Sequence, residues 1–245
     1  MGKLIFLLLI LYLSLSTGIL SAGSYPVPFS STYQGGKYLI FSAESIISLE
    51  RYNDYYKYSM TTEGSVLFYT RRIYDCSVMR IDDDNIYPVE HKHHDEGDKK
   101  YSSHTIFNWD TRQASTAFGD GRNKSTTLET FPTWDPMSIH IKVMLDLIKD
   151  QFTTINTYKL IENASLSDQS IKYAGEELVV SPHYSLQGHK VESVTGDANK
   201  LWYSSDYHYL PIKMEISGVT VELVSEPSTS RQPAKQVVEN FIPKC

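Results

Sequence analysis

One stretch of the sequence has the hydrophobic periodicity of an α-helix. Asp135 is suited to cap the free amides of a first turn, and Pro136 suits the first helical position because its φ is already helical. The apolar positions that follow form a stripe at intervals of three and four residues, made of Met137, Ile141, Met144, Leu145 and Ile148. The stripe is widened by Ile139, Val143 and Leu147. We therefore predict a helix over about residues 136–149 that lies in the concavity of a sheet.

Most of the remaining chain has the pattern of β-strands. Apolar and polar residues alternate over Leu210–Ile216 and over Val219–Leu223, on either side of the turn Ser217-Gly218. Prolines and paired glycines predict an irregular entry over Tyr25–Gly36, before a first strand that starts at Lys37. These patterns predict a mainly β protein: a single-domain curved antiparallel sheet or incomplete barrel, wrapped around one central α-helix.

The beginning of the chain has the pattern of a signal peptide. Lys3 precedes an unbroken apolar run, Leu4–Leu13, and small residues that suit cleavage follow around Ala22. The alternative is an uncleaved membrane anchor, because Leu4–Leu20 approaches the length that spans a bilayer. The predicted division is a signal peptide at 1–22, a β-rich domain at 23–225, and a linker with a C-terminal tail at 226–245. We expect a periplasmic or secreted protein with peripheral or no membrane association after cleavage.

The charge balance excludes one class of partner. The chain has 23 basic and 29 acidic residues, a formal net charge of −6. Removal of residues 1–22 takes away Lys3, so the balance becomes 22 minus 29, or −7. Non-specific binding to nucleic acid needs a basic surface, so we expect no nucleic-acid partner.

Cys76 and Cys245 are the two cysteines of the chain. In an exported protein they can form an intramolecular disulfide that closes a very long loop. The alternative is a buried Cys76 and a mobile, unpaired Cys245. The distance between them in the fold decides between these two interpretations.

A run rich in histidine is the segment of the sequence that most resembles a metal site. On a strand, His91 and His93 share one face, and His104 lies on the predicted returning strand. Three imidazoles on one face can hold a zinc ion, so these residues are the candidate metal site. The alternative is a solvated hairpin tip, and Lys92 between the two histidines favours it. We predict no cofactor.

Several segments, taken in order, resemble a known family. They are Phe107-Asn108-Trp109-Asp110, Trp134-Asp135-Pro136-Met137-Ser138, Tyr173-Ala174-Gly175-Glu176-Glu177-Leu178, Lys200-Leu201-Trp202-Tyr203-Ser204-Ser205-Asp206 and Leu210-Pro211-Ile212-Lys213. Over roughly Tyr38 to Val224 the chain resembles an exported bacterial family known as a domain of unknown function. The resemblance implies a β-rich protein of the Gram-negative envelope, similar in outline to the half-barrels of periplasmic lipoprotein carriers. It brings no catalytic residues.

Three functions compete at this point. The first is a non-enzymatic binding or carrier module for an apolar or amphipathic envelope molecule, such as a lipid or glycan. Its candidate ligand-binding residues are Trp134, Met137, Ile141, Met144 and Trp202, because the wide apolar surface of the helix could line a cavity. The second is a scaffold or interaction protein that binds other envelope proteins. The third is a metal-dependent hydrolase built on the three histidines.

Overall fold

The structure is a computed structural model that describes residues 25–37, 41–66, 69–82, 85–129, 131–196, 198–229 and 242–245. The predicted signal peptide at 1–22 lies outside these residues. The predicted linker and tail at 226–245 are described at 226–229 and 242–245.

The fifteen strands in the described part of the chain form one antiparallel sheet. They are β1 (Phe29–Lys37), β2 (Phe41–Tyr52), β3 (Tyr55–Val66), β4 (Tyr69–Asp82), β5 (Asn85–Asp95), β6 (Ser103–Asn108), β7 (Gln113–Phe118), β8 (Asn123–Thr127), β9 (Ile155–Glu162), β10 (Ser165–Val180), β11 (Ser185–Ser193), β12 (Lys200–Ser204), β13 (Leu210–Ile216), β14 (Val219–Leu223) and β15 (Ser228–Thr229). Two 3₁₀ turns, η2 (Lys99–Tyr101) and η3 (Ser205–Tyr207), and the helix α2 (Ser138–Ile148) complete the described elements.

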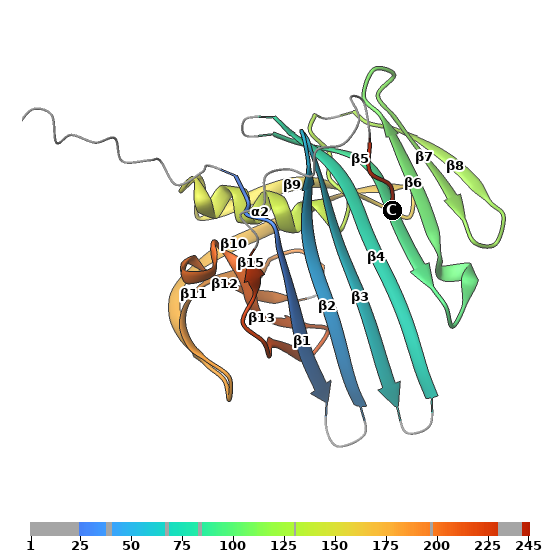
Figure 1. Ribbon diagram of the computed structural model, residues 1–245. Coiled ribbons are helices and arrows are strands. Elements are labelled where there is room, and N and C mark those ends of the chain that lie inside the picture. The colour runs from blue at the N-terminus through green and yellow to red at the C-terminus, as the bar shows by residue number, and fades with distance from the viewer. Residues whose placement is uncertain are drawn as a thin grey trace, which may run out of the picture.

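The order of the strands explains the position of the helix. Along the sheet the order is β8-β7-β6-β5-β4-β3-β2-β1-β14-β13-β12-β11-β10-β9, with β15 paired to β1. The chain therefore starts in the middle of the sheet, moves outward to one edge at β8, and returns from the other edge at β9. The helix α2 belongs to the connection between these two edges, and Figure 1 shows it inside the curve of the sheet, across the direction of β1 to β4. The predicted fold class is confirmed.

The sheet stays open between its edge strands β8 and β9, and we call this gap the seam. Individual contacts still join its two sides, and two of them involve β8 and the connection that follows it. The Thr126 hydroxyl of β8 donates to the carbonyl of Ala164, at 2.9 Å, and Trp134 forms a single parallel bridge with Leu160 of β9. The two edges therefore lie close together without pairing as neighbouring strands.

The helix begins two residues later than predicted, but its cap is the predicted one. Asp135 Oδ1 accepts hydrogen bonds from the amides of Met137 (2.8 Å) and Ser138 (2.9 Å). In return, the Asp135 amide donates to Ser138 Oγ at 2.9 Å, so side chain and backbone cap each other reciprocally. Pro136 lies in the turn before the helix, which starts at Ser138.

The irregular entry predicted over Tyr25–Gly36 is wrong, because β1 occupies most of it. Phe29 and Tyr33 point inward and are buried, whereas Gln34 is exposed, as a strand requires. Gly35 lies so close to β14 that an added Cβ would stand 2.5 Å from the carbonyl oxygen of Thr220. Glycine here permits close strand pairing, and the paired glycines therefore mark a strand instead of a break.

Candidate functional site

The helix fills the half-barrel. Of the residues predicted to line a ligand cavity, Trp134, Met137, Ile141 and Met144 are each at most 6 % exposed. All four belong to the main hydrophobic cluster, together with residues of β1 to β4 and of β9 to β14. In this structure they are therefore core residues, and the width of the apolar stripe reflects burial on nearly all sides of the helix.

Trp202, the fifth predicted ligand residue, has a different structural role. It lies next to Tyr203 on β12, so its side chain points to the opposite face of the sheet. The indole ring is flanked by the ammonium groups of Lys190 (5.3 Å) and Lys213 (5.0 Å). Its Nε1 donates to a carboxylate oxygen of Glu177 at 2.6 Å. Trp202 is 3 % exposed and belongs to the same hydrophobic cluster as the other four residues, so it is also a core residue, and its ring in addition contacts charged side chains.

A charged network lies in the interior next to the helix. Asp146 pairs with Lys142 one turn earlier on α2 and accepts a hydrogen bond of 2.8 Å from the Tyr158 hydroxyl. Burial raises the pKa of Tyr158, so the phenol remains a donor at any physiological pH. The network satisfies the buried carboxylate of Asp146, which fits a structural role.

The three histidines predicted to bind metal do not come together. His104 pairs with Lys92 across β5 and β6, so it lies on the face opposite to His91 and His93. The predicted three-histidine site is therefore wrong, because strand register decides the face and a sequence does not show register. No group of three or more metal-ligating side chains exists among the described residues.

Each histidine has its own surroundings. His93 Nδ1 lies 2.6 Å from Asp75 Oδ1, and this hydrogen bond raises the pKa of His93. His104 Nε2 lies 2.7 Å from Glu90 Oε1 on the other face of the sheet. These are pairs of one histidine with one carboxylate.

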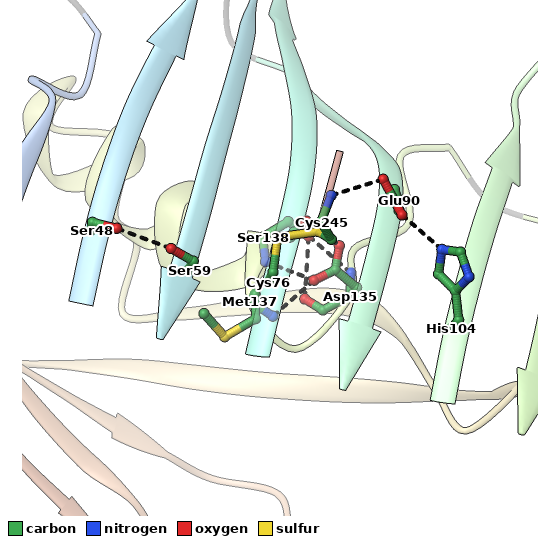
Figure 2. The surroundings of a disulfide bond; sticks show 10 residues. Ser48, Ser59, Cys76, Glu90, His104, Asp135, Met137, Ser138 and Cys245 are labelled. Atoms are coloured by element: carbon green, nitrogen blue, oxygen red, sulfur yellow. Dashed lines mark hydrogen bonds and ion pairs between the residues drawn. A yellow bond between two sulfur atoms is a disulfide. The ribbon is translucent and has the colours of Figure 1, made fainter. Parts of the chain in front are cut away.

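The two cysteines form a disulfide, with a sulfur–sulfur distance of 2.11 Å. The pair is 169 residues apart in the sequence. The chain-entropy model assigns about 5 kcal/mol of stabilisation to a loop of this length. Figure 2 shows Cys245 reaching β4, with its amide 3.1 Å from Glu90 Oε2 on β5. The interpretation with unpaired cysteines does not describe this structure.

A hollow at the seam brings together residues that are distant in the sequence. It has a volume of about 730 Å³. Its lining comes from the η2 turn, the β7–β8 hairpin and the β9–β10 turn, and consists of Lys100, Tyr101, Phe118, Asp120, Arg122, Asn123, Lys124 and Asn163. Three cations and one carboxylate give this lining a formal charge of +2, in a chain of net charge −6. We call it the seam hollow.

Two cations of the seam hollow are held in the same way. Lys100 lies 4.8 Å above the ring of Tyr101, and its ammonium is 2.9 Å from the carboxylate of Asp98. Arg122 lies 4.8 Å above the ring of Phe118, with Nε 2.7 Å from Asp120. In each case an aspartate two residues earlier and an aromatic ring orient the cation. The side chains are thus arranged before any ligand arrives.

Protonation of the two aspartates is disfavoured in this arrangement. The hydrogen bond from the Lys100 side chain lowers the pKa of Asp98, and the hydrogen bond from the Arg122 amide, followed by that from its side chain, lowers the pKa of Asp120. Both carboxylates therefore stay charged, and stay paired with Lys100 and Arg122, at pH values below the usual pKa range of aspartate.

The turn that carries Arg122 depends on one glycine. The amide of Gly119 donates to the Ser102 carbonyl at 2.8 Å, and an added Cβ would lie 1.8 Å from the carbonyl oxygen of Lys99. A glycine is needed for this close approach of the β7–β8 turn to η2. The sequence interpretation did not include these residues. The repeated spacing of an aspartate and a cation, Asp98-x-Lys100 and Asp120-x-Arg122, was the available signal.

Other hollows in the described surface lie elsewhere on the sheet. One of about 740 Å³ covers the outer faces of β1 to β4, one of about 420 Å³ lies at the β2–β3 turn, and one of about 390 Å³ lies on β6 to β8. None of the four hollows is lined by Trp134, Met137, Ile141 or Met144. Among the described helices, none has the length and apolar character to cross a membrane.

Comparison with known proteins assigns a family and a fold. No curated protein matches the chain significantly. Among solved structures, the chain is similar to a β-barrel-like protein from Brucella abortus, from the domain of unknown function DUF1849. The similarity covers 85 % of this chain and 100 % of that one, at 7 % identity and a TM-score of 0.52, and therefore concerns the fold alone. The family model of DUF3108, a family of proteins of unknown function, matches residues 29–223, and the chain belongs to this family.

Proposed function

We propose that this protein is an exported, non-enzymatic binding module that holds an amphipathic envelope molecule by an anionic head group. The observation that carries the proposal is the seam hollow, where three cations meet two aromatic rings on an otherwise acidic protein. Phosphate and carboxylate groups are the ligands that preoriented arginine and lysine side chains favour. A lipid head group or an acidic glycan supplies such groups.

The position of the hollow supports binding from outside. Its lining residues come from turns at the ends of strands, where side chains are open to solvent, and the rigid sheet holds these turns in place. Asn123 and Asn163 add amide groups that can bind hydroxyl or ester oxygens. The site thus combines charge with neutral polar groups, as a sugar or glycerol head group requires.

Export is supported by the disulfide and by the pattern of the first 22 residues. A disulfide persists in oxidising compartments and is rare in the cytosol. A charged start followed by an apolar run is the pattern of a cleaved signal. We expect the protein in the periplasm or outside the cell.

The test is native mass spectrometry of residues 23–245, purified without a tag from the periplasm, with organic extraction of the same sample. We expect a bound species that carries phosphate or carboxylate. The triple variant Lys100→Gln, Arg122→Gln, Lys124→Gln should lose it. The triple variant Lys57→Gln, Arg72→Gln, Lys172→Gln removes the same charge elsewhere and should keep it. A mass without ligand in the wild-type protein, or equal retention in both variants, contradicts the proposal.

A second candidate function, a scaffold for envelope proteins, is favoured by the open edge of β8. No described strand pairs with the outer edge of this strand, and a partner strand could add there. Lys124, the second residue of β8, weakens this possibility, because a lysine on an edge strand disfavours pairing. Cross-linking in the periplasm tests it: a partner attached at Asn123–Thr127 supports the scaffold over the binding module.

A further inference from the structure

Two neighbouring residues of β4 connect it to different parts of the molecule. Ser77 points inward, and its hydroxyl donates to Asp135 Oδ2, at 2.8 Å, beneath the start of α2. Cys76 points to the outer face and is bonded to Cys245, as Figure 2 shows. The disulfide therefore fastens residues 242–245 on the face of the sheet opposite to the helix.

The two cysteines differ in exposure. Cys76 is fully buried, whereas Cys245 is partly exposed. Residues 242–245 are not part of a strand, and the amide of Cys245 is held by Glu90 at 3.1 Å. An incoming thiolate therefore reaches the sulfur of Cys245 first, and Cys76 is the sulfur that must leave.

The surroundings of Cys76 favour its departure as a thiolate. Lys92 lies directly opposite Cys76 in the register of β4 and β5, so both side chains share the outer face. A nearby ammonium stabilises a thiolate, and a more stable thiolate leaves faster in thiol–disulfide exchange. Lys92 is thus the basic residue that the strand register places beside the buried cysteine.

We propose that Cys245 is a site of thiol–disulfide exchange with an external dithiol oxidoreductase, and that the exchange releases residues 242–245 from the outer face of β4 and β5. A thiolate of the partner attacks Sγ of Cys245, the Cys76–Cys245 bond breaks, and Cys76 leaves as a thiolate that takes a proton from water. The second thiolate of the partner then attacks the mixed disulfide and releases Cys245. The partner loses two electrons and becomes a disulfide, and the disulfide of this protein gains them.

Release changes the outer face while leaving the helix side intact. Cys76 and Val78 share this face two residues apart, and both are fully buried in the oxidised structure. The contact of Ser77 with Asp135 lies on the other side of β4 and does not involve residues 242–245. We therefore expect an open, folded form with newly accessible residues on β4.

The test traps the mixed disulfide. The oxidised full chain is incubated with a thioredoxin-type oxidoreductase whose second cysteine is replaced by serine, and the linked peptide is mapped by mass spectrometry. We expect attachment at Cys245 in about tenfold excess over Cys76. Attachment mainly at Cys76, or attachment that appears only when the near-ultraviolet circular dichroism of the fold is lost, overturns the proposal.

Variants test whether the disulfide takes part in exchange or only stabilises the fold. Lys92→Gln should slow reduction by dithiothreitol by about three- to tenfold, because the leaving thiolate loses its ammonium. Lys172→Gln, which removes an exposed charge on β10, should leave the rate unchanged. Equal rates in Lys92→Gln and the wild type overturn the assignment of Cys76 as an assisted leaving group. Cys245→Ser should fold, and its hydrogen exchange along β4 should match that of the reduced protein. Failure of this variant to fold would show that the disulfide only stabilises the structure.

Discussion

The half-barrel has two parts that the same sheet builds in different ways. Around α2, the inner faces of the strands meet a helix that is apolar on nearly all sides, and the space is filled. Toward the seam, the second hydrophobic cluster has four buried members, Phe107, Ala114, Leu128 and Ile161, and buried polar residues such as Thr105 and Thr116 surround it. The filled part provides stability, whereas the seam leaves charged side chains around an open hollow. Binding is therefore expected where the core is thinnest.

The largest expected effect compares the two cores. Met144→Ala in the helix removes a side chain that is 1 % exposed, and we expect a loss of about 3–5 kcal/mol in the free energy of unfolding. Leu128→Ala, at 2 % exposure in the seam cluster, should cost about 2–3 kcal/mol because fewer neighbours lose contacts and the site can relax. Urea unfolding measures both. A larger loss at Leu128 would contradict this division of the molecule.

The next comparison concerns two aspartates. Asp135 is fully buried and accepts from two helix amides and the Ser77 hydroxyl. Asp135→Ala should cost about 2–4 kcal/mol, because the cap is lost and buried donors remain unpaired. Asp120→Ala at the seam removes an exposed ion pair with Arg122 and should leave stability nearly unchanged. Thermal unfolding at equal ionic strength distinguishes the two, and equal costs would argue that the seam hollow is part of the stabilising core.

The helix part should also be more sensitive to acid. Desolvation lowers the pKa of His140 to about 4, so the folded state disfavours the charged imidazole. Its contribution to stability is present above about pH 6.5 and is lost as pH falls toward about 4, by at most about 3 kcal/mol. His93, whose pKa is raised by its hydrogen bond to Asp75, acts in the opposite direction: its stabilisation is present in acid and is lost as pH rises through the raised pKa.

Variants of the two histidines separate these contributions. His140→Gln should flatten the fall in unfolding free energy between about pH 6.5 and 4. His93→Gln should leave that window unchanged and should remove the loss of stability that occurs as pH rises above about 6.5, through the raised pKa of His93. Urea unfolding at a series of pH values measures both slopes. An unchanged slope in His140→Gln would show that this imidazole is hydrated in the folded protein.

The smallest effect on stability is expected where the effect on binding is greatest. The triple variant Lys100→Gln, Arg122→Gln, Lys124→Gln should leave the free energy of unfolding nearly unchanged, because these side chains lie at the surface. Equilibrium unfolding checks this. A large loss would mean that the cations support the fold, and loss of a ligand in the same variant would then say little about binding.

Local patterns predicted the parts of the fold that local sequence determines. The helix, its Asp135 cap and the strands β13 and β14 follow from periodicity within a few residues. The strand β1 was missed because its glycines suit a close neighbour, β14, that is distant in the sequence. A sequence pattern shows which residues are apolar, but it does not show how far a barrel is filled.

The candidate site also depends on contacts between residues that are far apart in the sequence. The sequence places His104 on the strand that returns beside His91 but leaves its face open, because the face depends on the register of β5 and β6. Lys100, Arg122 and Asn163 come from three different turns, and only the curvature of the sheet brings them together at the seam. The disulfide was one of two interpretations left open, since pairing depends on the distance between Cys76 and Cys245 in the fold.

The most direct test of the central claim is an NMR titration of the oxidised protein with glycerol 1-phosphate, a soluble anionic head group. The proposal predicts saturable shifts of the amides of Tyr101, Arg122 and Lys124, with no change at Met144, and loss of these shifts in the triple variant of the seam cations. Shifts centred elsewhere, or equal shifts in wild type and triple variant, would contradict the assignment of the seam hollow as the binding site.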